Sequence, residues 1–290
     1  MLFRSRTGLE VSVAGLGCGG SSRLGLEQGH SDAHAVSIIR AAVDCGVNLI
    51  DTASAYGTEH VVGLALKELP RDKLVISTKH KIARGNTADG VYSAAEIVAG
   101  LDASLKALGT DYIDIYFLHT VFPDAYEHAV NECLPALKRE QARGKIRFIG
   151  VTEAPPLDAT HAMASRAARD GHWDVMMFAF HMLSQNARQS VFPSAIKNSV
   201  GTLIMFAVRS LFSVPGRLKH DVDALVDEGR LPAWLKAKHN PLDFLLHEGG
   251  AQSIIEACYR YARHEPGAHV VLFGTGRSEE RTSELQSRFG

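Results

Sequence analysis

Eight short runs of apolar residues recur along the chain, and longer segments with helical periodicity separate them. Short, continuous runs rich in Val and Ile are typical of strands that are buried on both faces of a parallel sheet. This alternation is the feature that most constrains the fold, because it predicts repeated strand-and-helix units. The predicted strands are Val13–Cys18, Asn48–Ala53, Leu74–Lys79, Ile113–His119, Ile146–Thr152, Val175–Phe180, Thr202–Ala207 and Val270–Thr275.

Five intervening segments have apolar residues three and four positions apart, which is typical of helices that flank a sheet. They are Asp32–Cys45, His60–Leu69, Ala94–Leu108, Tyr126–Arg143 and Thr160–Arg169. Ser93 and Glu96 form the pattern of a capping box at the start of the third segment.

Eight such units are typical of a (β/α)8 TIM barrel of roughly 250 residues, so we expect residues 1–276 to form one barrel. A doubly wound open sheet is the alternative that the pattern leaves open. The interval Val208–Gly250 contains three prolines and is too long for a simple connection. We expect it to be an inserted loop with short helices that shapes a substrate pocket.

The composition describes an ordinary globular chain, with 46% hydrophobic residues and a formal net charge of -1. Without a basic surplus, neither nucleic acid nor an anionic membrane is an expected partner. The sequence has no run of about 18 apolar residues, and arginines occupy its start, so we expect a cytoplasmic protein. The cysteines form no CxxC pair and the histidines no HExxH motif, so no metal site is expected.

Four polar residues fall at or just after the ends of three successive predicted strands. Asp51 lies near the end of the second strand, and Tyr56 follows in its loop. Lys79 ends the third strand and His119 ends the fourth. Active-site groups of parallel barrels lie at these strand ends, so we expect the four side chains to converge. Each alone has a structural interpretation as a cap, packing residue, surface charge or interior histidine, but their joint placement favours catalysis.

The four side chains have complementary chemistry. A tyrosine is a weak acid at neutral pH, and we expect the ammonium of Lys79 to lower the pKa of Tyr56. Asp51 is expected to keep Lys79 charged, and His119 to hydrogen-bond a substrate oxygen. Such a site can donate a proton during carbonyl reduction, but it contains no hydride. A nicotinamide cofactor is therefore expected.

The segments GVNLIDTASAYGTEHVVGLALK, VISTKH, LGTDYIDIYFLH and GKIRFIGV resemble the signatures of the aldo-keto reductase family, in that family's order. The resemblance covers most of the chain and implies a catalytic tetrad of Asp51, Tyr56, Lys79 and His119. It also implies an oxidoreductase that interconverts a small-molecule aldehyde or ketone and an alcohol, with NADP(H) expected over NAD(H). The alternatives are a cofactor-binding sensor or regulatory subunit of the same fold, and an inactive truncated fragment.

The resemblance also implies cofactor contacts, several of which depart from the family pattern. Thr152 and Glu153 occupy the place of the Ser-Asn pair that holds the nicotinamide amide. Phe180 aligns with the tyrosine that stacks on the nicotinamide and keeps its aromatic face. Val208 and Arg209 follow the seventh strand, and Arg209 is predicted to contact the pyrophosphate. A surface ion pair is the alternative for Arg209.

Two glycine-rich segments are predicted to bring backbone close to the cofactor. Gly274, Thr275 and Gly276 resemble the phosphate-binding turn that follows the eighth strand in the family. Gly17 belongs to a GxGxxG match, but the residues after it do not have the pattern of a helix, so a Rossmann site is not predicted. We interpret Gly17 as a point of close backbone approach to substrate or cofactor.

The last segment, residues 277–290, does not resemble the family's C-terminal helix. Its sequence, RSEERTSELQSRFG, resembles the conceptual translation of a sequencing adapter, and we interpret it as an atypical, non-native tail. We then expect the barrel to lack its last outer helix and to expose apolar surface beside the first and eighth strands. Lower stability or self-association and weaker binding of the cofactor's adenosine end are expected. The sequence leaves open both the substrate and the choice between monomer and homo-oligomer.

Overall fold

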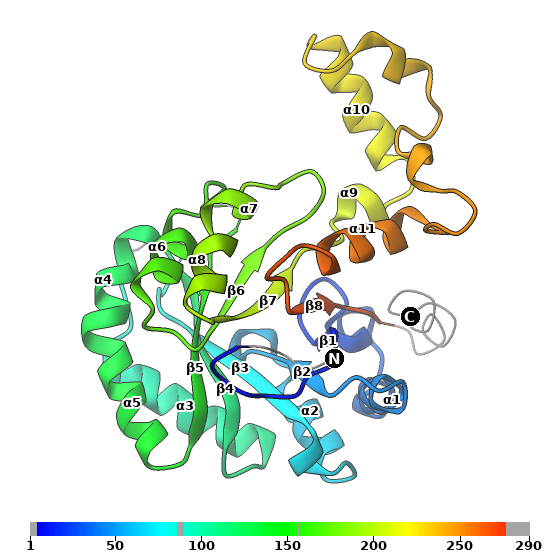
Figure 1. Ribbon diagram of the computed structural model, residues 1–290. Coiled ribbons are helices and arrows are strands. Elements are labelled where there is room, and N and C mark those ends of the chain that lie inside the picture. Colours follow the sequence, from blue (N-terminus) through cyan, green and yellow to red (C-terminus); the bar gives the residue numbers. More distant parts are fainter. Residues whose placement is uncertain (1–4, 86–89, 156, 277–290) are drawn as a thin grey trace.

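The computed structural model describes residues 5–85, 90–155 and 157–276. Its eight strands are parallel and close into a barrel, in which each strand pairs with the next and β8 pairs with β1 (Figure 1). The predicted TIM barrel is confirmed, and the closure excludes an open doubly wound sheet. The strands are β1 Ala14–Gly17, β2 Leu49–Asp51, β3 Val75–Lys81, β4 Ile113–Val121, β5 Ile146–Glu153, β6 Val175–Ala179, β7 Gly201–Met205 and β8 Val270–Phe273.

Helices on the connections cover the outside of the barrel (Figure 1). The predicted capping box is formed, because Ser93 Oγ accepts from the backbone of Glu96 and the Glu96 carboxylate accepts from the backbone of Ser93. The fourth predicted helix consists of α4 and α5 joined by a π-helical turn. The helices are α1 Asp32–Asp44, α2 Glu59–Leu66, α3 Ala94–Leu108, α4 Tyr126–His128, α5 Leu134–Ala142, α6 Ala162–Asp170, α7 Ala187–Ser190, α8 Phe192–Lys197, α9 Ser210–Ser213, α10 Arg217–Asp227 and α11 Ile254–Arg263.

Alternate residues of each strand face two different hydrophobic clusters, because successive side chains of a strand point to opposite faces. The inner cluster fills the barrel with residues such as Leu49, Val75 and Phe117, and Leu9 and Val11 from the segment before β1 join it. The outer cluster lies between the sheet and the helices and includes Ile50, Ile76, Tyr116 and Phe178. A side chain at the C-terminal end of a strand therefore faces the mouth of the barrel when it lies an even number of residues from a member of the inner cluster. We call this position the inner parity.

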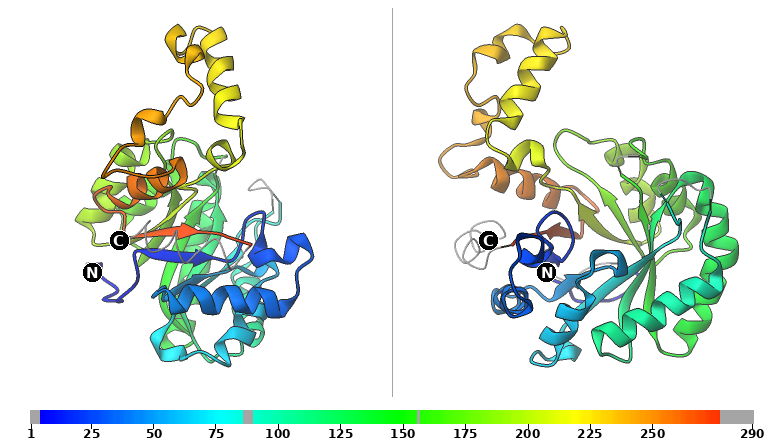
Figure 2. Two further views of the ribbon diagram at one scale, coloured as in Figure 1. Left: turned by 90° about the vertical axis from the view of Figure 1, so that its right-hand side faces the viewer. Right: turned by 180° about the vertical axis from the view of Figure 1, so that it is seen from behind.

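The connection between β7 and α11 forms an arm, residues 209–253, that extends away from the barrel in every view (Figures 1 and 2). It carries α9, α10 and two short 3-10 turns, which confirms the predicted insertion with short helices. None of the α10 residues is buried, and Trp234 and Phe244 are 60% and 72% exposed. The arm is therefore held to the barrel mainly at its two ends.

The predicted tail and the predicted loss of an outer helix both concern residues 277–290, which lie outside the described residues. Within the described part, no helix combines the length and apolar character needed to cross a membrane. No cluster of three or more His, Cys, Asp or Glu side chains there is arranged to hold a metal ion.

Candidate active site

Strand register brings three of the predicted catalytic residues to the mouth of the barrel. Asp51 is the last residue of β2 and pairs in register with Ser77 of β3. Lys79 lies two residues after Ser77, and His119 lies two residues after Phe117, a member of the inner cluster. Because side chains two positions apart on a strand share a face, Asp51, Lys79 and His119 all face the interior.

Tyr56 reaches the same place from a short turn after β2. The chain forms the 3-10 turn Ser54–Tyr56, which ends at Gly57 in the left-handed conformation (φ 68°). The centroid of the Tyr56 ring lies 5.1 Å from Lys79 Nζ, and 5.7 Å from the His119 ring in an edge-to-face arrangement. The structure thus brings all four predicted residues together.

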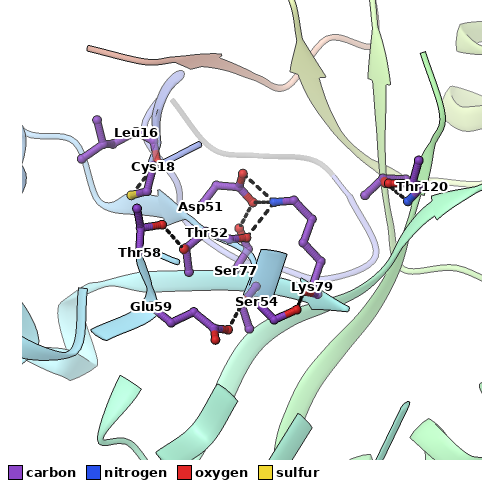
Figure 3. Close-up of polar contacts among 12 residues, drawn as sticks. Leu16, Cys18, Asp51, Thr52, Ser54, Thr58, Glu59, Ser77, Lys79 and Thr120 are labelled. Carbon is purple, nitrogen blue, oxygen red and sulfur yellow. Dashed lines mark hydrogen bonds and ion pairs between the residues drawn. The ribbon is translucent and has the colours of Figure 1, made fainter. Parts of the chain in front are cut away.

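A buried ion pair forms the base of this site (Figure 3). The Lys79 ammonium donates to Asp51 Oδ1 at 2.6 Å, to Asp51 Oδ2 at 2.7 Å and to the backbone oxygen of Thr52 at 2.8 Å. Ser77 Oγ donates to Asp51 Oδ1 at 2.6 Å. The ammonium therefore has three oxygen atoms from two residues within hydrogen-bond distance. Sequence reasoning missed Ser77, although its position two residues before Lys79 on one strand signals a shared face.

The pKa of Lys79 lies above its ordinary value. Burial alone lowers this pKa, but the charge and hydrogen bonds of the Asp51 carboxylate, and the charge of Tyr56 when it is a phenolate, raise it and together outweigh burial. Lys79 therefore stays an ammonium although its side chain is fully buried. The predicted role of Asp51, to keep Lys79 charged, agrees with this geometry.

The Lys79 ammonium lowers the pKa of Tyr56 as predicted, but the net shift of this pKa is upward. Burial raises the pKa of Tyr56, and this effect exceeds the lowering by the Lys79 ammonium, so the net pKa lies above 10. Asp51 adds a smaller upward contribution because it repels a phenolate. Tyr56 is therefore a protonated hydroxyl at neutral pH, which suits a proton donor.

His119 is a neutral imidazole in this environment. Burial lowers its pKa well below 6.5, and the positive charge of Lys79 lowers it further. Its Nδ1 atom is buried and has no hydrogen-bond partner among the described residues. A neutral ring that faces the mouth can hydrogen-bond a substrate oxygen without adding a charge.

Gly19 provides the space that the Tyr56 ring occupies. A Cβ atom at position 19 would lie 2.6 Å from Tyr56 Cε2 and 2.8 Å from Cζ. The backbone of Gly19 is not in the left-handed region, so the requirement for glycine here is steric. Sequence reasoning interpreted this glycine-rich segment as a backbone approach to a ligand, whereas Gly19 approaches the tyrosine itself.

We predict that Gly19→Ala lowers kcat about tenfold to a hundredfold, because the added methyl group displaces the Tyr56 ring from its position beside Lys79. Gly85→Ala is the matched control, since no atom of the described residues lies within 4 Å of a Cβ at that position. The measurement is steady-state kinetics together with thermal unfolding of both variants. Unchanged kcat in Gly19→Ala would show that Tyr56 does not depend on this contact.

The glycines that were predicted to approach the cofactor lie where β1 and β8 are side by side. A Cβ at Gly17 would lie 3.4 Å from the backbone oxygen of Phe273, and a Cβ at Gly274 would lie 3.6 Å from the backbone oxygen of Gly17. Gly276 accepts a hydrogen bond at its backbone oxygen from the His34 ring, with an N···O distance of 3.0 Å. Gly17, Gly274, Thr275 and Gly276 therefore form one backbone-lined edge of the mouth.

The side chains of Thr152 and Glu153 point to opposite faces of β5. Thr152 has the inner parity and pairs in register with Met177, and its Oγ1 accepts from the backbone of Thr120 at 2.8 Å. Glu153 points the opposite way, where Oε1 accepts from Ala179 N at 2.6 Å and Oε2 lies 2.7 Å from His161 Nδ1. The carboxylate of Glu153 is therefore engaged away from the place where the prediction puts the nicotinamide amide.

Phe180 also lies away from the mouth. Its ring is fully buried and packs against the rings of Phe192 and Tyr261, with centroids 5.2 and 5.7 Å away. It offers no open face for the predicted stacking on a nicotinamide. Phe206, directly after β7, is 39% exposed and was missed by sequence reasoning. The signal for it was an isolated aromatic residue at a C-terminal strand end.

Val208 directly precedes the arm and Arg209 is its first residue, and both are half-buried. The guanidinium carbon of Arg209 lies 4.5 Å from the centroid of the Phe206 ring. No carboxylate of the described residues forms an ion pair with Arg209, so the alternative of a surface ion pair is not formed there. Both residues belong to the β7 side of the mouth.

The chain matches the model of the Aldo/keto reductase family over residues 16–288. It is 31% identical over 287 residues to the aldo-keto reductase YhdN of Bacillus subtilis (strain 168), a match that covers 92% of this chain and 82% of the relative. It is also 32% identical over 179 residues to the NADH-specific methylglyoxal reductase of Escherichia coli (strain K12), covering 57% and 53% of the two chains. The chain therefore belongs to the aldo/keto reductase family and is an oxidoreductase of carbonyl and alcohol substrates.

Solved structures share the fold. The holo form of an aldo-keto reductase from Bacillus halodurans superposes with a TM-score of 0.72 at 23% identity, over 99% of this chain and 89% of the other. An aldo/keto reductase from Klebsiella pneumoniae in complex with NADP and acetate gives a TM-score of 0.68 at 23% identity, over 99% and 89%. Identities this low show the barrel fold alone.

Proposed function

We propose that this chain is an NADP(H)-dependent oxidoreductase that interconverts an aldehyde or ketone and an alcohol, with Tyr56 as the proton donor. The observation that carries the proposal is the fully buried Lys79, which bridges the Asp51 carboxylate and the Tyr56 ring. A buried ammonium is costly in a protein interior, so its position beside the ring of a tyrosine points to proton chemistry.

The residues act in sequence around the substrate oxygen. His119, as a neutral ring, hydrogen-bonds the carbonyl oxygen and orients it toward Tyr56. Tyr56 donates its hydroxyl proton to that oxygen. A bound nicotinamide would supply the hydride for the carbonyl carbon. Lys79 stabilises the phenolate that remains, and Asp51 with Ser77 holds Lys79 in place. In the reverse direction the phenolate of Tyr56 takes the proton from an alcohol.

The mouth has groups that fit a dinucleotide. Gly17 and Gly274 let two strand ends lie backbone to backbone, and we propose that Gly274, Thr275 and Gly276 present amide groups to a phosphate. On the β7 side, Arg209 supplies a cation for the pyrophosphate and Phe206 an exposed aromatic face. Val208 and Thr152 complete the proposed contacts. Glu153 and Phe180 are left out, because their side chains are engaged elsewhere.

The preference for NADP(H) over NAD(H) is testable by titration. We expect NADPH to bind more tightly than NADH, as the resemblance to the family implies. Arg209 is assigned to the pyrophosphate, which both cofactors carry, so it does not discriminate between them. One relative carries the name of an NADH-specific reductase, so the measurement decides between the two cofactors. The experiment follows nicotinamide fluorescence during titration with each cofactor. Equal or tighter binding of NADH would overturn the NADP(H) assignment.

The pH dependence of carbonyl reduction follows from the two pKa directions. Reduction needs protonated Tyr56, and activity falls only when the pH rises through its pKa, which burial raises above 10. His119 must stay neutral, and its pKa lies well below 6.5. We therefore predict a flat kcat/KM between about pH 6.5 and 10. A profile of NADPH-dependent reduction with a decline centred near pH 7 or 8 would contradict this prediction.

The formed contacts among Asp51, Lys79 and Tyr56 support turnover over the alternative of a cofactor-binding sensor or regulatory subunit. A sensor needs to hold a nicotinamide but has no use for a poised proton donor. The same contacts argue against an inactive fragment. The cytoplasmic location, the absence of nucleic acid partners and the choice between monomer and homo-oligomer stay predictions from the sequence.

A further inference from the structure

The turn that carries Tyr56 is hydrogen-bonded to β3 on both sides of the tyrosine (Figure 3). Ser54, two residues before Tyr56, donates from Oγ to the backbone oxygen of Lys79 at 3.2 Å. Glu59, three residues after Tyr56, accepts at Oε1 from Thr78 Oγ1 at 2.6 Å. Thr78 and Lys79 are neighbours on β3, so both hydrogen bonds join the turn to the part of the strand that presents the ammonium.

Packing contributes little to the position of this turn. Ser54, Ala55 and Gly57 are exposed, and a Cβ at Gly57 would have no atom of the described residues within 4 Å. The ring of Tyr56 packs against Gly19, but both neighbours of Tyr56 in the chain are exposed. The position of the Tyr56 backbone therefore depends on the hydrogen bonds at the two ends of the turn.

The hydrogen bond between Thr78 and Glu59 is buried. Thr78 is fully buried, and Glu59 is 8% exposed. A hydroxyl that donates to a carboxylate forms a short hydrogen bond, roughly twice as strong as one between neutral groups. Glu59 is also the first residue of α2, where the helix dipole favours a negative charge. The carboxylate therefore fixes the start of α2 against β3.

A second buried contact closes the loop between β2 and α2 at its base. Thr52 Oγ1 and Thr58 Oγ1 lie 2.8 Å apart, and both residues are fully buried. Thr52 directly follows β2, and Thr58 directly precedes Glu59. Because the base of the loop is closed, a shift of Glu59 relative to β3 is not absorbed within the loop. Such a shift moves the whole turn, and Tyr56 with it.

We propose that Thr78 and Glu59 are positioning residues whose hydrogen bond, the Thr78–Glu59 clamp, holds Tyr56 beside the Lys79 ammonium. The inference rests on the proposed function, because it concerns the alignment of the proposed proton donor. The centroid of the Tyr56 ring lies 5.1 Å from Lys79 Nζ. A displacement of about 1 Å at a reacting group can cost about a hundredfold in rate. The clamp therefore acts on kcat, whereas cofactor binding does not depend on it.

Thr78→Val tests the clamp, because valine keeps the shape of threonine and lacks its hydroxyl. We expect kcat for carbonyl reduction to fall about tenfold to a hundredfold, with the Kd of NADPH unchanged. Thr78→Ser keeps the hydroxyl and should have a kcat close to the parent's. Thr202→Val is the matched control, since Thr202 is a fully buried threonine at the N-terminal end of β7, remote from the mouth, and donates to the backbone oxygen of Gly267. This control should leave kcat unchanged.

Variants of Glu59 separate the hydrogen bond from the effect of charge at the start of α2. Glu59→Gln keeps an oxygen that accepts from Thr78 and should have a kcat close to the parent's. Glu59→Met removes the acceptor and should lower kcat as much as Thr78→Val does. It also removes the buried carboxylate and leaves no unpaired charge, so it keeps the test decisive if Thr78→Val does not fold. Equal losses of kcat in Glu59→Gln and Glu59→Met would assign the effect to the charge and overturn the clamp.

The clamp should have no effect once the hydroxyl that it positions is removed. In the Tyr56→Phe background, Thr78→Val should therefore leave the residual kcat unchanged. The same fractional loss of kcat in both backgrounds would show that Thr78 supports the fold and does not position Tyr56. A kcat of Thr78→Val equal to the parent's would overturn the proposal as well.

The same variants distinguish failure of the clamp from failure of the proposed function. If Tyr56→Phe keeps the parent's kcat, Tyr56 is not the proton donor, and the clamp fails together with that assignment. If Tyr56→Phe loses activity and neither Thr78→Val nor Glu59→Met does, the proton donor stands and only the clamp fails.

Discussion

Replacing Lys79 by methionine is expected to lower the free energy of unfolding by about 3–5 kcal/mol and to remove most turnover. Methionine has a similar length and no charge, so the Asp51 carboxylate would stay buried with Ser77 as its one remaining side-chain partner among the described residues. An uncompensated buried charge is the main cause of the expected loss. Denaturant unfolding measures the stability, and NADPH oxidation measures the turnover.

The double variant Asp51→Asn, Lys79→Met separates the two effects. With both charges removed, Ser77 can still donate to the new amide oxygen, so we expect most of the stability to return. Activity should not return, because the phenolate of Tyr56 would lack its ammonium. Equal stability of the parent and Lys79→Met would contradict the buried ion pair, and an active double variant would contradict its chemical role.

Replacing Tyr56 by phenylalanine is expected to reduce kcat by a factor of about 10² to 10⁴, the usual contribution of a general acid. The change removes the hydroxyl and leaves the ring, which Gly19 and His119 contact, in its place. We therefore expect the affinity for NADPH and the stability to stay close to those of the parent. Steady-state kinetics and a fluorescence titration of the cofactor measure the two quantities.

Tyr112→Phe is a matched control for that variant. Tyr112 lies before β4, remote from the mouth, and its ring stacks under Arg71 with the guanidinium carbon 4.0 Å from the centroid. Loss of its hydroxyl should leave kcat unchanged. If Tyr56→Phe retained the parent's kcat, another group would have to supply the proton. If both variants lost activity together, the effect would be on the fold and not on catalysis.

The fold was predictable because its signals are local. Each strand is an apolar run, and each of the first outer helices has its own periodicity and its own ends, as the capping box of Ser93 and Glu96 shows. Barrel closure depends on a long-range contact, the pairing of β1 with β8, and we inferred it from the number of strand-and-helix units. The arm was expected as an insertion, but its extension away from the barrel depends on tertiary contacts that no local pattern encodes.

The tetrad was predictable for the same reason. Asp51, Lys79 and His119 follow from strand ends and alternation, and Tyr56 from a turn that directly follows β2. The pKa of Tyr56 was not predictable, because the neighbouring charge is visible in the sequence and the degree of burial is not. Burial turned out to be the larger effect.

The predicted contacts of Glu153 and Phe180 show where resemblance misleads. Thr152 and Glu153 are adjacent on β5, so only one of them can face the mouth, and the structure gives that place to Thr152. Phe180 lies three residues after Met177, a member of the inner cluster, so it takes the opposite face. The alternation of side chains along a strand indicates that Glu153 and Phe180 face away from the mouth. Their actual partners, His161 and Tyr261, could be found only in three dimensions.

The most direct test of the proposed function counts turnovers. The protein is mixed with excess NADPH and a panel of aldehydes and ketones, and nicotinamide absorbance is followed until the reaction stops. The contacts of Tyr56, Lys79 and Asp51 predict that at least one carbonyl compound drives the oxidation of many NADPH molecules per chain. Oxidation of no more than one NADPH per chain across the panel, with the cofactor shown to bind, would contradict catalysis and indicate a sensor.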